Sequence, residues 1–140
     1  MRSAIVAAGA IILAVASGAA YSEGTPPLEE TVTPIFERAL PNIRGKSLIA
    51  LEVLYRPGGA SPPHKHPQSA FIYAYVLSGE IASAVDDEVP RVYRAGEGWF
   101  EVPGAHHRVS RNASKTEPAK LLAIFVVDDG QRQLVFPDAN

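Results

Sequence analysis

Apolar residues in this chain recur in short runs rich in branched and aromatic side chains, and each run ends at glycine, proline or an acidic cluster. Runs with such ends predict strands rather than helices. From residue 47 onward, no segment carries the 3.6-residue apolar period of an amphipathic helix. The strands that we expect are residues 47–55, 70–77, 80–85, 91–94, 99–102, 107–110, 119–127 and 131–136.

Short strands at this regular spacing are typical of an antiparallel sandwich or a small barrel. The fold class that we expect is therefore all-β, a small antiparallel β-barrel over residues 46–140. Prolines punctuate residues 25–42, which we expect to contribute an early edge strand. Residues 23–45 are accordingly assigned as an N-terminal extension of the barrel.

The first 22 residues have the pattern of a secretory signal peptide. Arg2 precedes an apolar run from Ala4 to Ala16, and small residues follow, with cleavage expected between Ala19 and Glu23. The run is shorter than the ~20 residues that span a bilayer. We therefore expect a periplasmic or secreted protein with no stable membrane insertion after cleavage.

Composition excludes several classes of partner and chemistry. The net charge is −2 and no basic run occurs, so neither nucleic acid nor an anionic membrane surface is an expected partner. The chain has no cysteine, which excludes disulfides and thiolate ligands. Any site chemistry must come from histidines, carboxylates and hydroxyls.

The four histidines fall in two short places, as His64 and His66 and as the pair His106-His107. Residues two apart in an extended segment point to one face, so His64 and His66 can converge on one point. His107 opens a later strand, and His106 is expected to face the opposite way. Three inward imidazoles are good ligands for a transition metal, whereas surface or satisfied core histidines are the alternative.

The segments around these histidines resemble the two motifs of the cupin superfamily. The matching positions are Gly59, His64, His66 and Gly79 in the first, and Gly98, Pro103, Gly104, His107 and Asn112 in the second. The resemblance covers roughly residues 45 to 136. It implies a small jelly-roll barrel with a metal inside near one mouth, and homodimers that pair through their sheets.

One departure from the cupin pattern concerns the fourth ligand. The position that usually carries a carboxylate or glutamine falls at about Ile72, and the nearest polar candidate is Gln68. Glu101 offers a substitute, because it and His107 flank the turn at Pro103-Gly104 and can face each other in a hairpin. The alternative is a solvent-facing Glu101, paired with one of two nearby arginines, Arg108 or Arg111.

The resulting candidate site is a divalent transition metal (Fe, Mn, Ni, Cu or Zn) on His64, His66, His107 and Glu101, with Glu101 also as the catalytic residue. The expected substrate-pocket residues are Gln68, Ile72, Tyr73 and Phe100, the last two being core or interface aromatics in the alternative reading.

Two function classes follow. The first is a metal-dependent enzyme that acts on a small organic substrate. Within this class, a quercetinase-like dioxygenase is the first subclass to test, because three His and one Glu resemble that branch. Isomerase or lyase chemistry stays open. The second is a non-catalytic cupin that binds a small ligand. A Glu101 that reaches the metal favours the first class.

Overall fold

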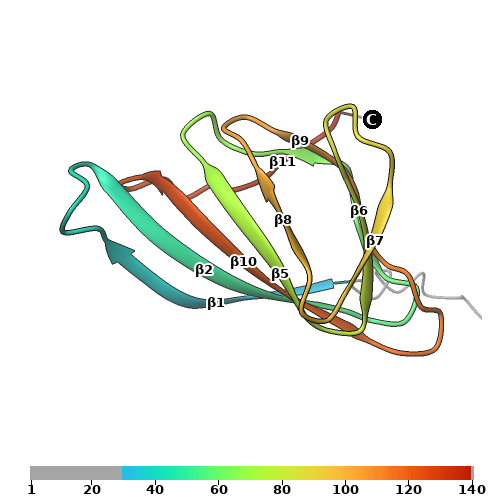
Figure 1. The fold of residues 1–140 in the computed structure, drawn as a ribbon. Helices are drawn as coiled ribbons and strands as arrows, with labels where there is room; N and C mark the ends of the chain where they lie inside the picture. Colours follow the sequence, from blue (N-terminus) through green and yellow to red (C-terminus); the bar gives the residue numbers. More distant parts are fainter. Residues whose placement is uncertain (1–29, 140) are drawn as a thin grey trace, which may run out of the picture.

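The computed structural model describes residues 30–139, and within this range the chain forms eleven strands and no helix. The strands are arranged in two antiparallel sheets that face each other (Figure 1). No helix in this part of the chain is thus available to cross a membrane. The predicted signal peptide, residues 1–22, lies outside the described residues.

The first sheet has five strands in the order β1-β2-β10-β5-β8. Their bounds are β1 Glu30–Ala39, β2 Lys46–Tyr55, β10 Ala119–Asp128, β5 Phe71–Ser78 and β8 Gly98–Glu101. The predicted early edge strand corresponds to β1, which lies at the margin of this sheet.

The second sheet has the order β11-β4-β9-β6-β7, with β3 also paired to β9. Its strands are β11 Phe136–Pro137, β4 His64–Lys65, β9 His106–Asn112, β6 Glu80–Val85, β7 Arg91–Arg94 and β3 Ala60–Ser61. The all-β prediction is confirmed. The strand predicted over residues 131–136 is wrong except at its end, because residues 131–135 run as an irregular segment beside the histidine cluster.

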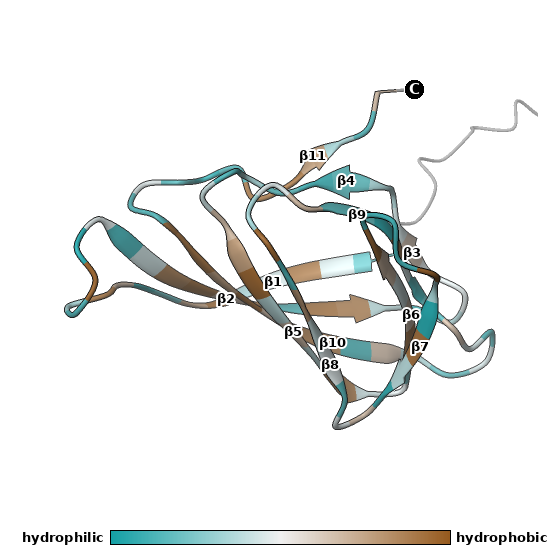
Figure 2. Cartoon of the chain, turned by 45° about the horizontal axis from the view of Figure 1, so that its top comes forward, coloured by the Kyte–Doolittle hydropathy of each residue, from teal (hydrophilic) through white to brown (hydrophobic). Residues whose placement is uncertain are grey.

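Alternation of side chains builds the core between the sheets. Along β10, buried and half-buried residues alternate from Ala119 to Val127, so every second side chain enters the core. Ile72, Val76 and Ile81 are fully buried, and each such side chain contributes roughly 1.5–3 kcal/mol through removal from water. In Figure 2 the brown, hydrophobic segments follow the long strands, whereas β4 is teal.

Two backbone irregularities place the polar residues inside the barrel. Gly104, between β8 and β9, adopts φ +75°, a backbone conformation that residues with a Cβ rarely adopt. In β9 the pairing with β6 shifts by one residue between His107 and Val109. This bulge brings both His107 and Ser110 to the buried face, although they are three residues apart.

Candidate metal centre

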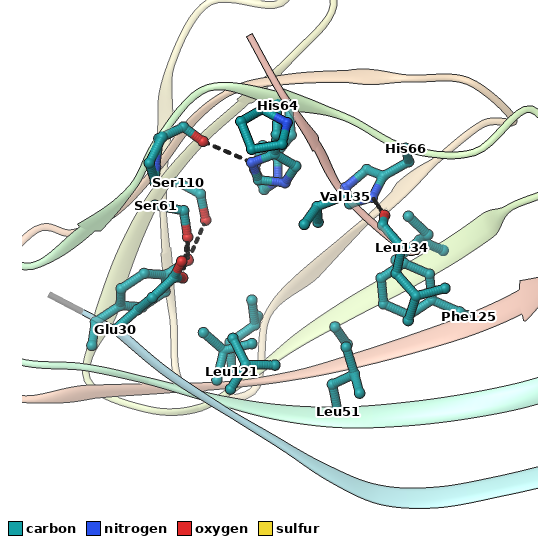
Figure 3. A pocket seen from close by; sticks show the side chains of 18 of the residues that line it. Glu30, Leu51, Ser61, His64, His66, Ser110, Leu121, Phe125, Leu134 and Val135 are labelled. Carbon is teal, nitrogen blue, oxygen red and sulfur yellow. Dashed lines mark hydrogen bonds between the residues drawn. The ribbon is translucent and has the colours of Figure 1, made fainter. Parts of the chain in front are cut away.

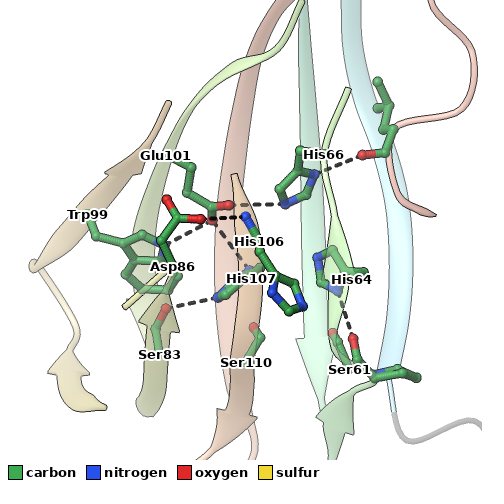
Figure 4. Close-up of polar contacts among 12 residues, drawn as sticks. Ser61, His64, His66, Ser83, Asp86, Trp99, Glu101, His106, His107 and Ser110 are labelled. Carbon is green, nitrogen blue, oxygen red and sulfur yellow. Dashed lines mark hydrogen bonds and ion pairs between the residues drawn. The ribbon is translucent and has the colours of Figure 1, made fainter. Parts of the chain in front are cut away.

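Three buried histidines meet at one end of the barrel interior. His64 lies on β4 and His107 on β9, and the two are direct cross-strand partners. His66 follows β4, and its ring centroid lies 4.8 Å from that of His64 and 6.2 Å from that of His107. One ring nitrogen from each residue can be chosen so that all three lie within 4.8 Å of one another. This is the predicted histidine cluster, and Figure 4 shows it from the side.

Backbone carbonyls orient two of the imidazoles. His64 Nδ1 lies 2.7 Å from the Pro62 carbonyl oxygen, and His66 Nδ1 lies 2.8 Å from that of Leu134. A carbonyl only accepts, so the proton of each neutral ring is on Nδ1 and the lone pair is on Nε2. A partner on the outer nitrogen is the usual support of a metal-binding histidine.

Ser83 and Glu101 hold the third imidazole. His107 Nε2 lies 2.9 Å from the Ser83 hydroxyl, and its Nδ1 lies 3.3 Å from Glu101 Oε1. Because a hydroxyl both donates and accepts, Ser83 can satisfy the ring in either tautomer.

Burial favours the neutral form of two of the three imidazoles, His64 and His107. Burial lowers the pKa of His107 to about 4, since desolvation penalises the imidazolium more than the Glu101 charge stabilises it. Burial also lowers the pKa of His64. Neutral rings keep the lone pairs that a metal requires.

Glu101 is 2% exposed and lies beside this cluster. Its Oε1 accepts a hydrogen bond of 3.1 Å from the Trp99 indole N–H. Its Oε2 lies 3.1 Å from His66 Nε2, yet no donor meets that oxygen with hydrogen-bond geometry. Burial alone would raise the pKa of Glu101, but the contacts with His66 and His107 outweigh it and hold the pKa below its ordinary value.

A buried, ionised carboxylate with one oxygen lacking a partner is costly by several kcal/mol unless a cation is near. A divalent metal ion held by the three imidazoles fits this donor set, with the Glu101 carboxylate beside it as the neighbouring negative charge. The alternative of a solvent-facing Glu101 is wrong. One of its suggested partners, Arg108, instead donates to the backbone carbonyl oxygens of Asp86 and Glu88.

The route by which Glu101 reaches His107 differs from the predicted hairpin. β8 belongs to the five-stranded sheet and β9 to the six-stranded one, so the two residues are not cross-strand partners. The chain turns the corner between the sheets at Pro103-Gly104, and the two side chains meet across the interior. The hairpin prediction is therefore wrong.

The cluster opens into a cavity of about 540 Å³ (Figure 3). An apolar wall of the cavity comes from β2 and β10, with Leu51, Val53, Leu121 and Phe125. Leu134 and Val135 of the irregular segment also line it. Cavities of roughly 300–1,000 Å³ with apolar walls and few polar groups are typical of small-molecule sites.

Of the four predicted pocket residues, the structure places one in the cavity wall. Ile72 lines the cavity, but Tyr73 is 45% and Phe100 62% exposed, on the outer face of the five-stranded sheet. Strand alternation explains this, because an inward Ile72 and an inward Glu101 force Tyr73 and Phe100 outward. Gln68 is exposed and lies against Gly104. The pocket assignment of these three residues is corrected accordingly.

Several groups at the site were not found from the sequence. These are the Leu134 carbonyl, the Ser83 hydroxyl, the Trp99 indole and a set of hydroxyls on one cavity wall. Only strand alternation could have indicated Ser83 and Trp99. His106 faces away from the cluster, as expected, and contacts Asp138 at 2.8 Å.

A family model described as "Cupin domain" matches residues 51–125. An oxalate oxidase structure in complex with glycolate is 26% identical with a TM-score of 0.60, over 79% of this chain and 56% of that one. The chain thus spans little more than half the length of that relative. The structure of TT1209 from Thermus thermophilus is 25% identical with a TM-score of 0.58, over 72% of this chain and 86% of that one.

A third similar structure is the DMSP lyase DddQ from Ruegeria pomeroyi. It is 25% identical with a TM-score of 0.54, over 66% of this chain and 45% of that one. No curated protein sequence matches this chain.

Proposed function

Because this chain belongs to the cupin domain family, we propose that it is an exported, metal-dependent enzyme that acts on a small organic molecule. One divalent transition metal is held by His64, His66, His107 and Glu101. When bound, the ion supplies a Lewis acid or an oxygen-activating centre.

The observation that carries this proposal is the unsatisfied Oε2 of Glu101 beside three buried histidines. One oxygen of this buried carboxylate has no hydrogen-bond partner in the protein, and a bound cation would supply one. A catalytic metal site keeps open coordination positions, and this one faces a cavity rather than packed core.

The chain's own residues have separable tasks in this proposal. The carbonyls of Pro62 and Leu134 fix the rings of His64 and His66. The apolar wall of Leu51, Leu121 and Phe125 excludes water and takes the body of the substrate. In the proposal, Glu101 offsets part of the charge of the ion and also serves as the general base.

Among reaction types, an oxidative one is the first to test. This choice is supported by the predicted dioxygenase-like chemistry and by the similarity to an oxalate oxidase, since both concern oxidation reactions. The similarity to a DMSP lyase keeps lyase chemistry open as well, and isomerase chemistry stays a candidate.

The second candidate function is a non-catalytic cupin that holds a small ligand. It is favoured by the hydrogen bond of Glu101 to Trp99, which restrains the carboxylate against the barrel wall. In that case the three imidazoles alone hold the ion.

A homodimer is part of the proposal. One row of side chains crosses all five strands on the outer face of the first sheet: Phe36, Ala50, Ile124, Tyr73 and Phe100. Phe71 stacks on Phe100 beside this row, with ring centroids 6.0 Å apart. An exposed apolar patch of this kind supports burial against a second copy.

The proposed function is tested by metal analysis together with oxygen uptake. The protein is isolated without a metal-affinity tag, and its metal is quantified by mass spectrometry. Oxygen consumption is then followed with small carboxylic acids, enols and hydroxyaromatics. We expect about one metal per chain and oxygen uptake that is lost in His107→Ala. Metal-free protein that also fails to take up added metal would overturn the proposal.

A further inference from the structure

One wall of the cavity carries four oxygen-bearing side chains in a continuous row. The Tyr55 hydroxyl lies 2.7 Å from the hydroxyl oxygens of both Ser61 and Ser110. Ser61 in turn donates to the carboxylate of Glu30. All four residues line the cavity, and Figure 3 shows Ser110, Ser61 and Glu30 along its side. The metal centre described above uses none of them.

The sheets bring these residues together as two cross-strand pairs. Glu30 of β1 pairs with Tyr55 of β2, and Ser61 of β3 pairs with Ser110 of β9. The first pair belongs to one sheet and the second to the other, so the row bridges the two sheets at the edge of the barrel. The β9 bulge that turns Ser110 inward is what completes the row.

The direction of every hydrogen bond in the row follows from counting protons. A carboxylate accepts only, so the single proton of Ser61 points to Glu30. Ser61 must then accept from Tyr55, which commits the single proton of Tyr55. Tyr55 must accept from Ser110, which commits the proton of Ser110. The row is polarised toward Glu30, and Ser110 has only lone pairs left to offer to the cavity.

We propose that Ser110 is the hydrogen-bond acceptor that orients ligands in this cavity, which therefore takes apolar, ring-sized molecules carrying an N–H or O–H donor. The rest of the wall supplies mainly aliphatic and aromatic surface, so the body of such a molecule is apolar. A ligand group that can only accept hydrogen bonds forms none with the lone pairs of Ser110. Both groups then lose their hydrogen bonds to water without gaining one in return. This inference rests on the proposed function in placing the ligand in the cavity beside His64.

The test uses three probes of nearly equal shape: indole, which donates, benzofuran, which has no donor, and 1-indanone, which accepts only. Affinities are measured by isothermal titration calorimetry with the full chain, as isolated and again after treatment with a chelator. Indole is expected to bind about fivefold or more tightly than benzofuran, as one neutral hydrogen bond implies. Equal affinities, or no binding of indole, would overturn the inference.

Glu30→Gln tests the polarity itself. The amide can donate to Ser61 as well as accept from it, so the row loses its fixed direction and Ser110 becomes free to donate. The preference for indole over benzofuran is expected to shrink to less than about twofold, and 1-indanone is expected to bind more tightly than in the parent protein. An unchanged preference would overturn the inference.

Two further variants complete the design. Ser110→Ala removes the acceptor and is expected to abolish the indole preference while benzofuran binding persists. Glu52→Gln is the matched control, because Glu52 lies on the neighbouring strand β2 and pairs with Lys120 at 3.0 Å, and neither residue lines the cavity. It is expected to keep the preference, and loss of the preference in Glu52→Gln would overturn the argument from polarity.

The result is separable from the proposed function. Glu30 and Ser110 are not metal ligands in that proposal, so their variants are expected to keep the metal content of the parent protein. A normal metal content without an indole preference would reject the acceptor subsite alone. An indole preference in a protein that binds no metal would reject the metal-dependent enzyme alone.

Discussion

Ile72 and Glu101 are direct cross-strand partners on β5 and β8, and both side chains face the barrel interior. Ile72 stands about where related domains carry a carboxylate or glutamine on the first motif. The Cβ atoms of cross-strand partners on one face lie ~5 Å apart. A carboxylate at position 101 can therefore reach the same part of the barrel interior as a carboxylate at position 72. In the proposed site, Glu101 therefore supplies the carboxylate from the neighbouring strand.

The three-histidine cluster predicts selective loss of metal. Replacing His64, His66 or His107 with alanine is expected to weaken metal binding by more than about 100-fold, the upper end of the effect of losing an outer partner of a ligand. His106→Ala is the control, because His106 contacts Asp138 instead. Metal titration of the four purified variants checks this. Retention of metal by His107→Ala would reject the assigned ligand set.

Glu101→Gln keeps the shape of the side chain and removes its charge. We expect metal affinity to fall ~10-fold or more while the fold is retained. The comparison is a metal titration of the two proteins, with circular dichroism as the check on the fold. Equal affinities would place Glu101 outside the metal site and favour the ligand-binding function.

The cross-strand relationship allows a sharper form of this experiment. In the double variant Ile72→Glu, Glu101→Ile the carboxylate returns to the first-motif strand. If the two positions are interchangeable, the metal affinity of the double variant is expected to exceed that of the single Glu101→Ile variant by about 10-fold. Equal affinities for the single and double variants would show that the position of Glu101 is specifically required.

Tyr55 predicts a loss of stability at alkaline pH. Burial raises the pKa of Tyr55 from 10.0 to about 12, because the phenolate loses its hydration inside the barrel. Between these values the unfolded chain releases the proton and the folded chain keeps it. Stability is therefore unaffected well below pH 10 and falls as pH rises, by roughly 1 kcal/mol at pH 11 and by up to roughly 3 kcal/mol above pH 12.

Tyr55→Phe isolates this effect from that of the other tyrosines. The variant is less stable at neutral pH by about 1–2 kcal/mol because Ser61 and Ser110 lose a partner. Its stability is expected to decline less between pH 9 and pH 11 than that of the parent, as measured by urea unfolding. Parallel declines in the two proteins would contradict the raised pKa.

The apolar outer face predicts that charge insertion dissociates the proposed homodimer. Phe100→Arg places a charge at one end of the row, on β8, and we expect sedimentation equilibrium to show a shift from dimer to monomer. Val89→Arg is the control, because Val89 is 84% exposed in the β6–β7 loop, away from this face. A parent protein that is monomeric at micromolar concentration would reject the dimer.

Export predicts a shortened N-terminus. Mass spectrometry of the protein from its native host is expected to find the first residue between Ala20 and Gly24, because small residues precede the expected cleavage site. A soluble cytoplasmic protein that starts at Met1 or Arg2 would contradict export.

The sequence was sufficient for the strands other than the one predicted over residues 131–136, and for the histidine cluster, because both depend on local rules. Period-two alternation places His64, and the order of apolar runs defines the barrel. The sequence was insufficient to tell that Tyr73 and Phe100 face outward. Which alternate side chains of β5 and β8 face the interior depends on where the opposite sheet packs. Ser110 could not be assigned either, because a bulge between residues 107 and 109 reverses the phase and carries no local signal.

The hydrogen bond between His66 and the Leu134 carbonyl makes the last part of the chain responsible for one of the imidazoles. Leu134 follows every long strand of both sheets, so during synthesis it leaves the ribosome after all of them. We therefore expect that the long strands can pair before His66 has its partner, and that the ring of His66 is oriented only when this segment docks. A chain cut before residue 131 would retain the long strands and all four proposed ligands, yet it would hold His66 without a fixed ring orientation.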